Sequence, residues 1–224
     1  MKMTGEARIR IRGTVQGVGF RPAVYRIASE LGISGTVRND GPDVIIECER
    51  GEELLSVLLD NLPPLAVVSD VISENTESSL SKGFRIIGSS PGSGSVSIPT
   101  DTAVCDRCLE EIRSHGRRSD YPFTSCTDCG ARFTLLSSLP YDRKNTSMEN
   151  FPMCSDCERE FKNPEDRRLH HQTICCPRCG PVYRLVDKNG ETIQGDPIPT
   201  FARMLSEGKV GVAKSWGGMH ICGT

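Results

Sequence analysis

Cys154-Ser-Asp-Cys157 is followed, after eighteen residues, by Cys176-Pro-Arg-Cys179. The same pattern stands earlier in the chain as Cys105-Asp-Arg-Cys108 and, after seventeen residues, Cys126-Thr-Asp-Cys129. Each copy supplies four thiolates at a spacing typical of zinc sites. Because four thiolates complete a tetrahedral sphere, we expect two structural zinc ions rather than catalytic ones. The repeat therefore predicts a small module of two zinc fingers (105–129 and 154–179) within residues 101–185.

The sequence leaves more than one possible set of zinc ligands. Aligning the copies on their final Cys-Gly places Cys176 opposite Cys126 and leaves Cys175 spare, although a slip of one residue would exchange the two neighbours. His170 and His171 precede the last pair, and we interpret them as loop residues rather than ligands. Ligands shared between the copies are a third option. The local spacing favours pairing within each copy.

Composition narrows the class of protein. The chain has 224 residues, 37% hydrophobic and 25% charged, with a formal charge of −2 and eleven cysteines. A nearly neutral balance argues against bulk nucleic-acid binding. Because the N-terminus lacks the apolar stretch of a signal peptide, we expect a cytoplasmic protein whose cysteines bind metal rather than form disulfides. No run approaches the length of a membrane span, so we expect no membrane role.

Residues 1–90 hold one cysteine and alternate between strand and helix patterns. In this region Ile9 and Ile11 alternate with arginines, as in a strand with one buried face. The expected strands are 7–12, 35–38, 44–49, 66–73 and 84–87, and the expected helices are 22–31 and 52–62. The order β-α-β-β-α-β predicts an α+β, ferredoxin-like domain.

The remaining segments complete the predicted organisation. The serine- and glycine-rich stretch 91–100 has the composition of a linker. Beyond the cysteines we expect a short helix at 199–208 and a buried strand at 210–213. Because the chain ends at Thr224 soon after that strand, we expect 186–224 to be the beginning of a further α/β domain that is cut short.

A glycine-rich loop joins the first predicted strand to the first helix. Its sequence is Thr14-Val-Gln-Gly-Val-Gly-Phe-Arg21. Glycines allow successive backbone N–H groups to point at one anion, and the N-terminus of the next helix adds positive charge. Arg21 can add a bidentate contact to phosphate. The predicted phosphate-binding residues are Gln16, Gly17, Val18, Gly19, Phe20 and Arg21.

The string from Gly13 to Arg21 resembles the signature of acylphosphatases, and the resemblance extends to Gly35-Thr-Val-Arg-Asn39. It implies that Arg21 clamps the phosphate of an acyl phosphate and that Asn39 positions the attacking water, so these two residues are the predicted catalytic pair. Phosphoryl transfer needs mainly positioning and charge stabilisation, which agrees with this small set of groups.

The residues between the cysteines resemble a second family. Arg117-Arg-Ser-Asp-Tyr-Pro-Phe-Thr-Ser-Cys126, Leu139-Pro-Tyr-Asp-Arg143 and Asn163-Pro-Glu-Asp-Arg-Arg-Leu-His-His-Gln172 look like the double zinc finger of the HypF family. Lys209-Val-Gly-Val-Ala-Lys214 and the residues that follow are similar to the start of that family's YrdC-like domain. An acylphosphatase domain followed by two fingers is also the HypF order.

The HypF resemblance implies a role in the maturation of nickel-iron hydrogenases. Carbamoyl phosphate would be hydrolysed at the loop, and the carbamate would be activated with ATP and magnesium. The carbamoyl group would then pass to a HypE-like partner, so this chain would perform only the first step. Lys214 is a candidate nucleotide-binding residue on this view, although a solvated lysine at a strand end is the simpler interpretation.

Two other functions are compatible with the sequence. One is a stand-alone acylphosphatase with a zinc scaffold, which would accept a broad range of acyl phosphates. The other is a non-catalytic zinc module that binds a protein or RNA. Arg117-Arg118 and Arg167-Arg168 could form a local basic patch for RNA, but we interpret both pairs as solvated surface residues.

Overall fold

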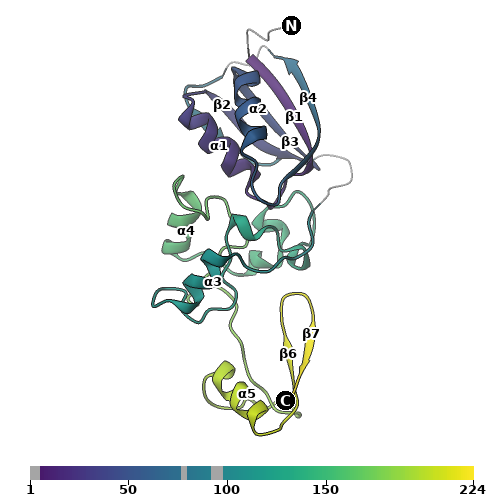
Figure 1. Cartoon of the computed structure of the whole chain (residues 1–224), viewed down its shortest axis with the longest axis vertical. Coiled ribbons are helices and arrows are strands. Elements are labelled where there is room, and N and C mark those ends of the chain that lie inside the picture. The colour runs from purple at the N-terminus through teal and green to yellow at the C-terminus, as the bar shows by residue number, and fades with distance from the viewer. Residues whose placement is uncertain (1–5, 77–79, 92–97) are drawn as a thin grey trace. The chain divides into compact units, whose positions relative to one another are not determined.

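The computed structural model describes residues 6–76, 80–91 and 98–224. The chain falls into two compact units, Met1–Cys179 and Gly180–Thr224 (Figure 1). Most of the predicted linker, residues 92–97, lies outside the described residues. Among the described helices, none combines the length and the apolar character needed to cross a membrane.

The N-terminal part of the first unit is a five-stranded sheet with two helices on one face (Figure 1). Neighbouring strands are antiparallel except β2 and β5, which are parallel, and the strand order is β4-β1-β3-β2-β5. The elements are β1 (Glu6–Thr14), α1 (Phe20–Glu30), β2 (Gly35–Asp40), β3 (Asp43–Glu49), α2 (Gly51–Asp60), β4 (Val67–Asn75) and β5 (Phe84–Ile86). The α+β, ferredoxin-like prediction is therefore confirmed.

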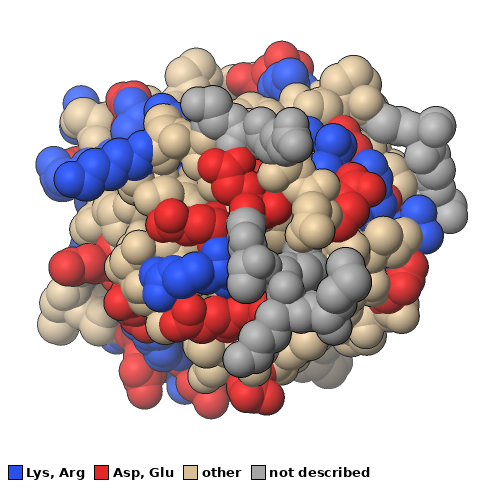
Figure 2. Space-filling model, turned by 90° about the horizontal axis from the view of Figure 1, so that it is seen from above, with Lys and Arg blue, Asp and Glu red and all other residues tan. Residues whose placement is uncertain are grey.

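The alternation along β1 explains why the helices cover only one face of the sheet. Ala7, Ile9 and Ile11 are fully buried in the core beneath α1 and α2. The intervening arginines lie on the opposite face, where Arg10 Nη1 donates to Asp43 Oδ2 at 2.8 Å. Basic and acidic side chains are interspersed rather than separated by sign on the face shown in Figure 2. Such a surface offers no single-sign field for a polyanion there.

The finger module follows in the same unit. Two helices, α3 (Asp106–Arg113) and α4 (Ser155–Lys162), each begin directly after the first cysteine of a copy. Four short 3-10 turns complete the module: η1 (Thr127–Cys129), η2 (Phe133–Leu135), η3 (Arg143–Asn145) and η4 (Ser147–Asn150). The eight cysteines form two groups of four, each group from one copy. The two predicted four-cysteine clusters are confirmed.

The two fingers are held together by arginines that reach from each copy into the other. Arg118 Nε donates to the carbonyl of Cys175 at 2.9 Å, and Arg168 Nε donates to the carbonyl of Ser125 at 3.0 Å. The two guanidinium groups also pair with carboxylates of the opposite copy, Arg118 with Glu160 and Arg168 with Glu111. The contacts are reciprocal, so neither finger can form its full set of buried bonds alone.

The arginine preceding each of these residues contacts a cysteine sulfur of the other copy. Arg117 Nη1 donates to Cys157 Sγ at 3.2 Å, and Arg167 Nη1 donates to Cys108 Sγ at 2.9 Å. Four thiolates around a divalent zinc carry a net charge of −2, so a neighbouring guanidinium stabilises each cluster. Each copy therefore supplies positive charge to the metal group of its partner copy.

The interpretation of the two arginine pairs as solvated surface residues is wrong for one arginine of each pair, whereas Arg117 is exposed and Arg167 is partly buried. Arg118 is 1% exposed and Arg168 is 4% exposed. A local count of charges missed this because most of their acceptors lie 40 to 60 residues away in sequence. Burying an arginine is tolerated only where carboxylates and carbonyls pair with it, as they do here.

The second unit contains α5 (Pro197–Ser206) and a hairpin of β6 (Gly211–Lys214) and β7 (Met219–Cys222). The Asp196 side chain caps α5 by accepting from Ile198 N at 3.4 Å. The predicted buried strand at 210–213 is wrong in its burial, because Val210 is 75% exposed and Val212 is 59% exposed. Its valines have no covering layer within the described residues of this unit.

Replacement of Arg118 by methionine tests the reciprocal arginine contacts. Arg118→Met leaves the Cys175 carbonyl without its buried donor and removes one of the arginines that pair with Glu160, so we expect the free energy of unfolding to fall by about 3 kcal/mol. Arg159→Met is the control, because Arg159 is exposed on α4 and should change stability by less than about 0.5 kcal/mol. Urea unfolding of the zinc-loaded protein measures both, and equal small effects would contradict this account.

Candidate active site

The glycine-rich loop lies between β1 and the first turn of α1. Gly17 and Gly19 have φ of 72° and 79°, in the left-handed region that favours glycine. The first turn of α1 contains no acidic residue and Gly19 makes no side-chain cap, so the helix N-terminus is not neutralised by a local carboxylate. This loop and helix end have the geometry of an anion-binding site.

Arg21 projects from this first turn and is largely buried. Its Nη2 donates to Asp142 Oδ1 at 3.0 Å and to the Tyr141 carbonyl at 3.4 Å, and its Nη1 donates to Ser89 Oγ at 3.3 Å. Burial lowers the pKa of Arg21, and the Asp142 carboxylate opposes that shift. Because a guanidinium keeps its proton in proteins, the loop retains one buried positive charge.

Asn39 lies in β2 with its side chain fully buried. Neither Oδ1 nor Nδ2 has a hydrogen-bond partner among the described residues. Buried amides are rarely left in this state, and such a group marks a place for a water or a ligand oxygen. Two neighbouring serines link Asn39 to Arg21. Ser89 Oγ accepts from Arg21, and Ser90 N donates to the Asn39 carbonyl at 2.9 Å.

Other predicted phosphate-binding residues use their side chains for packing. Gln16 Nε2 donates to the Gly41 carbonyl at 2.8 Å, and its Oε1 accepts from the Tyr141 backbone N–H at 3.0 Å. Val18 and Phe20 are buried in the core of the sheet domain. At these three positions only the backbone is left to contact an anion.

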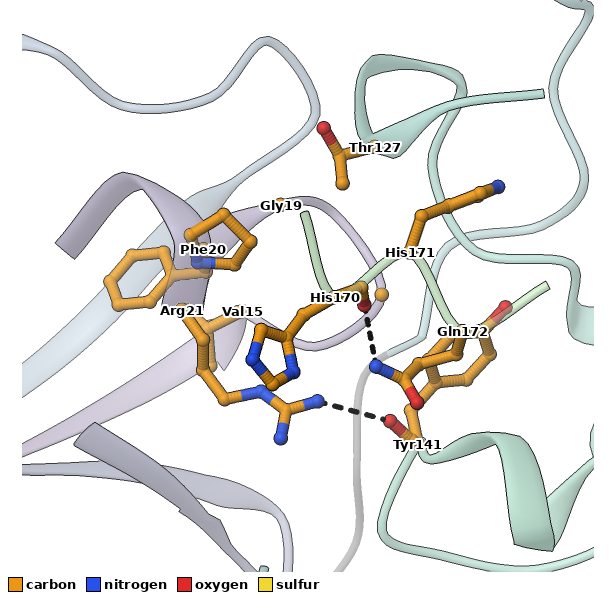
Figure 3. Close-up of a pocket in the computed structure, with 11 residues that line it drawn as sticks. Val15, Gly19, Phe20, Arg21, Thr127, Tyr141, His170, His171 and Gln172 are labelled. Carbon is orange, nitrogen blue, oxygen red and sulfur yellow. Dashed lines mark hydrogen bonds between the residues drawn. The ribbon is translucent and has the colours of Figure 1, made fainter. Parts of the chain in front are cut away.

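The zinc fingers form the opposite wall of the pocket at the loop, which sequence reasoning did not anticipate (Figure 3). Tyr141 is 2% exposed, and its hydroxyl accepts from Arg132 N at 2.8 Å. The finger residues that line the pocket are Thr127, Tyr141, His170, His171 and Gln172. No local signal around 141–142 or 170–172 indicates this contact, because Asp142 lies 121 positions from Arg21.

His170 and His171 belong to the pocket wall rather than to a cysteine cluster. Burial, and after it the charge of Arg21, lowers the pKa of His170 to about 4. Burial lowers the pKa of His171 to about 3, and its Nε2 lies 2.9 Å from Ser125 Oγ. Both rings are therefore neutral near pH 7 and leave Arg21 as the charged residue lining this pocket.

The sulfur positions fit zinc. Four sulfurs placed about 2.3 Å from one zinc ion in a tetrahedron lie roughly 3.8 Å apart. The observed separations are 3.7 Å for Cys105–Cys126, 3.9 Å for Cys126–Cys129, 3.8 Å for Cys154–Cys176 and 3.7 Å for Cys176–Cys179. Cys175 lies outside the second group, near the Tyr121 hydroxyl, and burial raises its pKa to about 11. The two groups are consistent with two zinc ions.

Lys214, the candidate nucleotide-binding residue, lies at the exposed end of β6 in the second unit. Its Nζ donates to the carbonyls of Ser215 at 2.7 Å and Trp216 at 3.4 Å. Within the described part of that unit, these contacts hold the ammonium group to its own turn.

Comparisons with known proteins agree with this architecture. The acylphosphatase family model matches residues 7–86, and the HypF finger model matches residues 104–136 and 153–186. Over 73 residues the chain is 44% identical to the acylphosphatase of Thermotoga petrophila, covering 31% of this chain and 81% of that protein. The first part of the chain is thus an acylphosphatase domain, and a double zinc finger follows it in the chain.

Longer relatives contain both parts. The chain is 43% identical over 217 residues to carbamoyltransferase HypF of Rhodobacter capsulatus, covering 96% of this chain and 29% of that protein. It also matches a crystal structure of full-length HypF in the phosphate- and nucleotide-bound form, with a TM-score of 0.86, 38% identity, and coverage of 96% of this chain and 29% of that one. The chain belongs to the HypF family and corresponds to its N-terminal part, the acylphosphatase domain with the HypF fingers. It spans less than a third of the length of these relatives.

Serine variants distinguish the two neighbouring thiols. Metal analysis of the purified protein should give two zinc ions per chain, with one lost in Cys176→Ser and both retained in Cys175→Ser. The two substitutions are chemically identical and one residue apart, so each controls for the other. Loss of zinc from Cys175→Ser with retention in Cys176→Ser would contradict the assignment of ligands.

Alanine variants test the contact between the loop and the fingers. A Cβ on Gly17 would lie 2.5 Å from Ala131 Cβ, whereas a Cβ on Gly32 meets nothing within 4 Å. Both glycines have positive φ, so each substitution should cost about 1 kcal/mol of unfolding free energy. Gly17→Ala should cost about a further 1–3 kcal/mol from overpacking. Equal losses of unfolding free energy in the two variants, measured by thermal unfolding, would show that the loop does not pack tightly against the finger.

Proposed function

We propose that this chain hydrolyses carbamoyl phosphate at the glycine-rich loop, as the first step of a carbamoyl transfer that matures nickel-iron hydrogenases. The observation that carries the proposal is the conjunction of a buried clamp arginine, Arg21, with the unpartnered buried amide of Asn39. The match to acylphosphatases over residues 7–86 supports the reaction class, and the match to HypF carbamoyltransferases supports the substrate.

In the proposed mechanism the phosphoryl oxygens accept from the backbone N–H groups of the loop, from the N-terminus of α1 and from Arg21. Asn39 Oδ1 accepts a hydrogen bond from the attacking water and orients it toward phosphorus. The new water–phosphorus bond forms as the bond from phosphorus to the acyl oxygen breaks. The electron pair leaves with the carbamate, and the water protons pass to phosphate and solvent.

This reaction requires little from general base catalysis. A mixed anhydride has a good leaving group, so positioning and charge stabilisation supply most of the rate enhancement. Placing water opposite the leaving oxygen is the contribution expected of Asn39. Neutralising charge on the phosphoryl oxygens is the contribution expected of Arg21 and the loop.

The later steps are assigned to the larger protein context. We infer that ATP- and magnesium-dependent activation of carbamate, and transfer of the carbamoyl group to a HypE-like protein in the cytoplasm, use parts of the longer relatives beyond the matched 29%. On this view residues 186–224 correspond to the start of a YrdC-like domain, and Lys214 would face the nucleotide there. The zinc ions, when bound, supply structural support rather than chemistry.

Release of phosphate from carbamoyl phosphate tests the proposal directly. Relative to the unmodified chain, Arg21→Ala should lower kcat/KM at least about 100-fold because the phosphoryl charge loses its clamp. Asn39→Ala should lower kcat by a similar factor while leaving binding of inorganic phosphate nearly unchanged. Spontaneous decomposition of the substrate is subtracted in each case.

Arg107→Ala serves as the control, since Arg107 is exposed on α3 and contacts only Asp128, at 3.9 Å, among the ion pairs of the described residues. Equal rates in all four proteins, or none above the spontaneous rate, would rule out the catalytic role and leave a non-catalytic zinc module. Equal efficiency with acetyl phosphate and carbamoyl phosphate would favour an acylphosphatase of broad specificity.

A further inference from the structure

The clamp arginine is already engaged by the finger module. A guanidinium can hold phosphate bidentately through the Nε–Nη2 edge or through the Nη1–Nη2 edge, and both edges include Nη2. The two hydrogens of Arg21 Nη2 point to Asp142 Oδ1 at 3.0 Å and to the Tyr141 carbonyl at 3.4 Å. A bidentate phosphate can therefore bind Arg21 only when one of these two acceptors withdraws.

Of the two acceptors, Asp142 is the one free to move. The backbone of Tyr141 is fixed because its N–H donates to the buried Gln16 and its ring is almost fully buried. The Asp142 carboxylate is attached through rotatable bonds, and its side chain retains 17% of its exposure. Its backbone stays anchored, with its N–H donating to the Pro140 carbonyl at 2.8 Å, so the side chain can rotate alone.

Charge also makes Asp142 the acceptor that must yield. Among the described residues, Asp142 is the carboxylate that forms an ion pair with Arg21. The nearby finger residue His170 is neutral near pH 7, because burial and Arg21 lower its pKa to about 4 (Figure 3). A phosphate beside Arg21 would therefore meet the negative charge of the Asp142 carboxylate, and two like charges this close repel each other.

We propose that Asp142 is a positioning residue of the phosphate site, which holds the Arg21 guanidinium between turnovers, yields to the phosphoryl group, and competes with the product phosphate for the same donor. The inference rests on the proposed phosphate-binding role of the loop. It gives the finger module a direct part in setting phosphate affinity, because Asp142 lies between the two four-cysteine groups in sequence and reaches the loop from the finger side.

Asp142→Asn tests this inference because asparagine keeps the shape and an acceptor for Arg21 but removes the charge. Inorganic phosphate is the probe, and its dissociation constant is measured by calorimetry on the zinc-loaded full chain. We expect phosphate to bind Asp142→Asn about tenfold more tightly, and KM for carbamoyl phosphate to fall by a similar factor. Because phosphate then leaves more slowly, kcat should not rise.

Two further variants make the result interpretable. Asp142→Ser removes the same charge with a smaller side chain and should change phosphate affinity in the same direction. Asp120→Asn is the control, because Asp120 is exposed at φ 55°, which asparagine tolerates, and lies in the first finger; it should leave phosphate binding unchanged. Zinc content and the unfolding midpoint confirm that each protein is folded.

The outcomes separate the inference from the proposed function. Unchanged or weaker phosphate binding in both Asp142 variants would overturn the inference, since a purely structural partner of Arg21 would give that result. Phosphate binding that is lost in Arg21→Ala but unchanged in Asp142→Asn would leave the proposed function standing alone. Absence of phosphate binding in every protein, including the unmodified chain, would overturn both.

Discussion

The arginine contacts between the two cysteine groups are the interaction on which the finger module, and with it one wall of the loop pocket, depends. Arg118 and Arg168 bond backbone carbonyls of the opposite copy, and Arg117 and Arg167 donate to its sulfurs. A lone four-thiolate group carries excess negative charge and has little apolar core around it. Pairing of the two copies offsets both deficits. The arginines of each copy offset the negative charge of the other copy's thiolates, and the segments between the cysteines become buried.

The paired fingers then form one wall of the pocket at the phosphate loop. Gly17 and Gly19 lack side chains where Ala131 and Thr127 approach, so the fingers can reach the loop closely. Arg26 on α1 strengthens this contact by donating to the carbonyls of Pro164 and Asp166. The cysteines themselves do not line the loop pocket, but residues of the finger module, including Thr127 directly after Cys126, do.

Sequence patterns predicted the first domain well because its signals are local. Period-two alternation in β1, apolar stripes in α1 and α2, and the glycine-rich turn between them each involve residues close together in the chain. The cysteine spacing was equally informative, since the two cysteines of each Cys-x-x-Cys pair lie within one turn. Burial of Arg118 and Arg168 and exposure of the 210–213 strand were mispredicted, because both depend on what packs against these residues from elsewhere in the chain.

By itself, the sequence determined the ferredoxin-like domain, the two four-cysteine groups, and Arg21 and Asn39 as candidate catalytic residues. Only the tertiary structure showed that the fingers form part of the loop pocket, with Asp142 paired to Arg21 across 121 positions of chain and His170 nearby. The physical reason is that spacing rules report on groups brought together by one helix, strand or turn. Contacts across an interface depend on the shape and charge of side chains that are distant in sequence. A local sequence pattern therefore does not predict them.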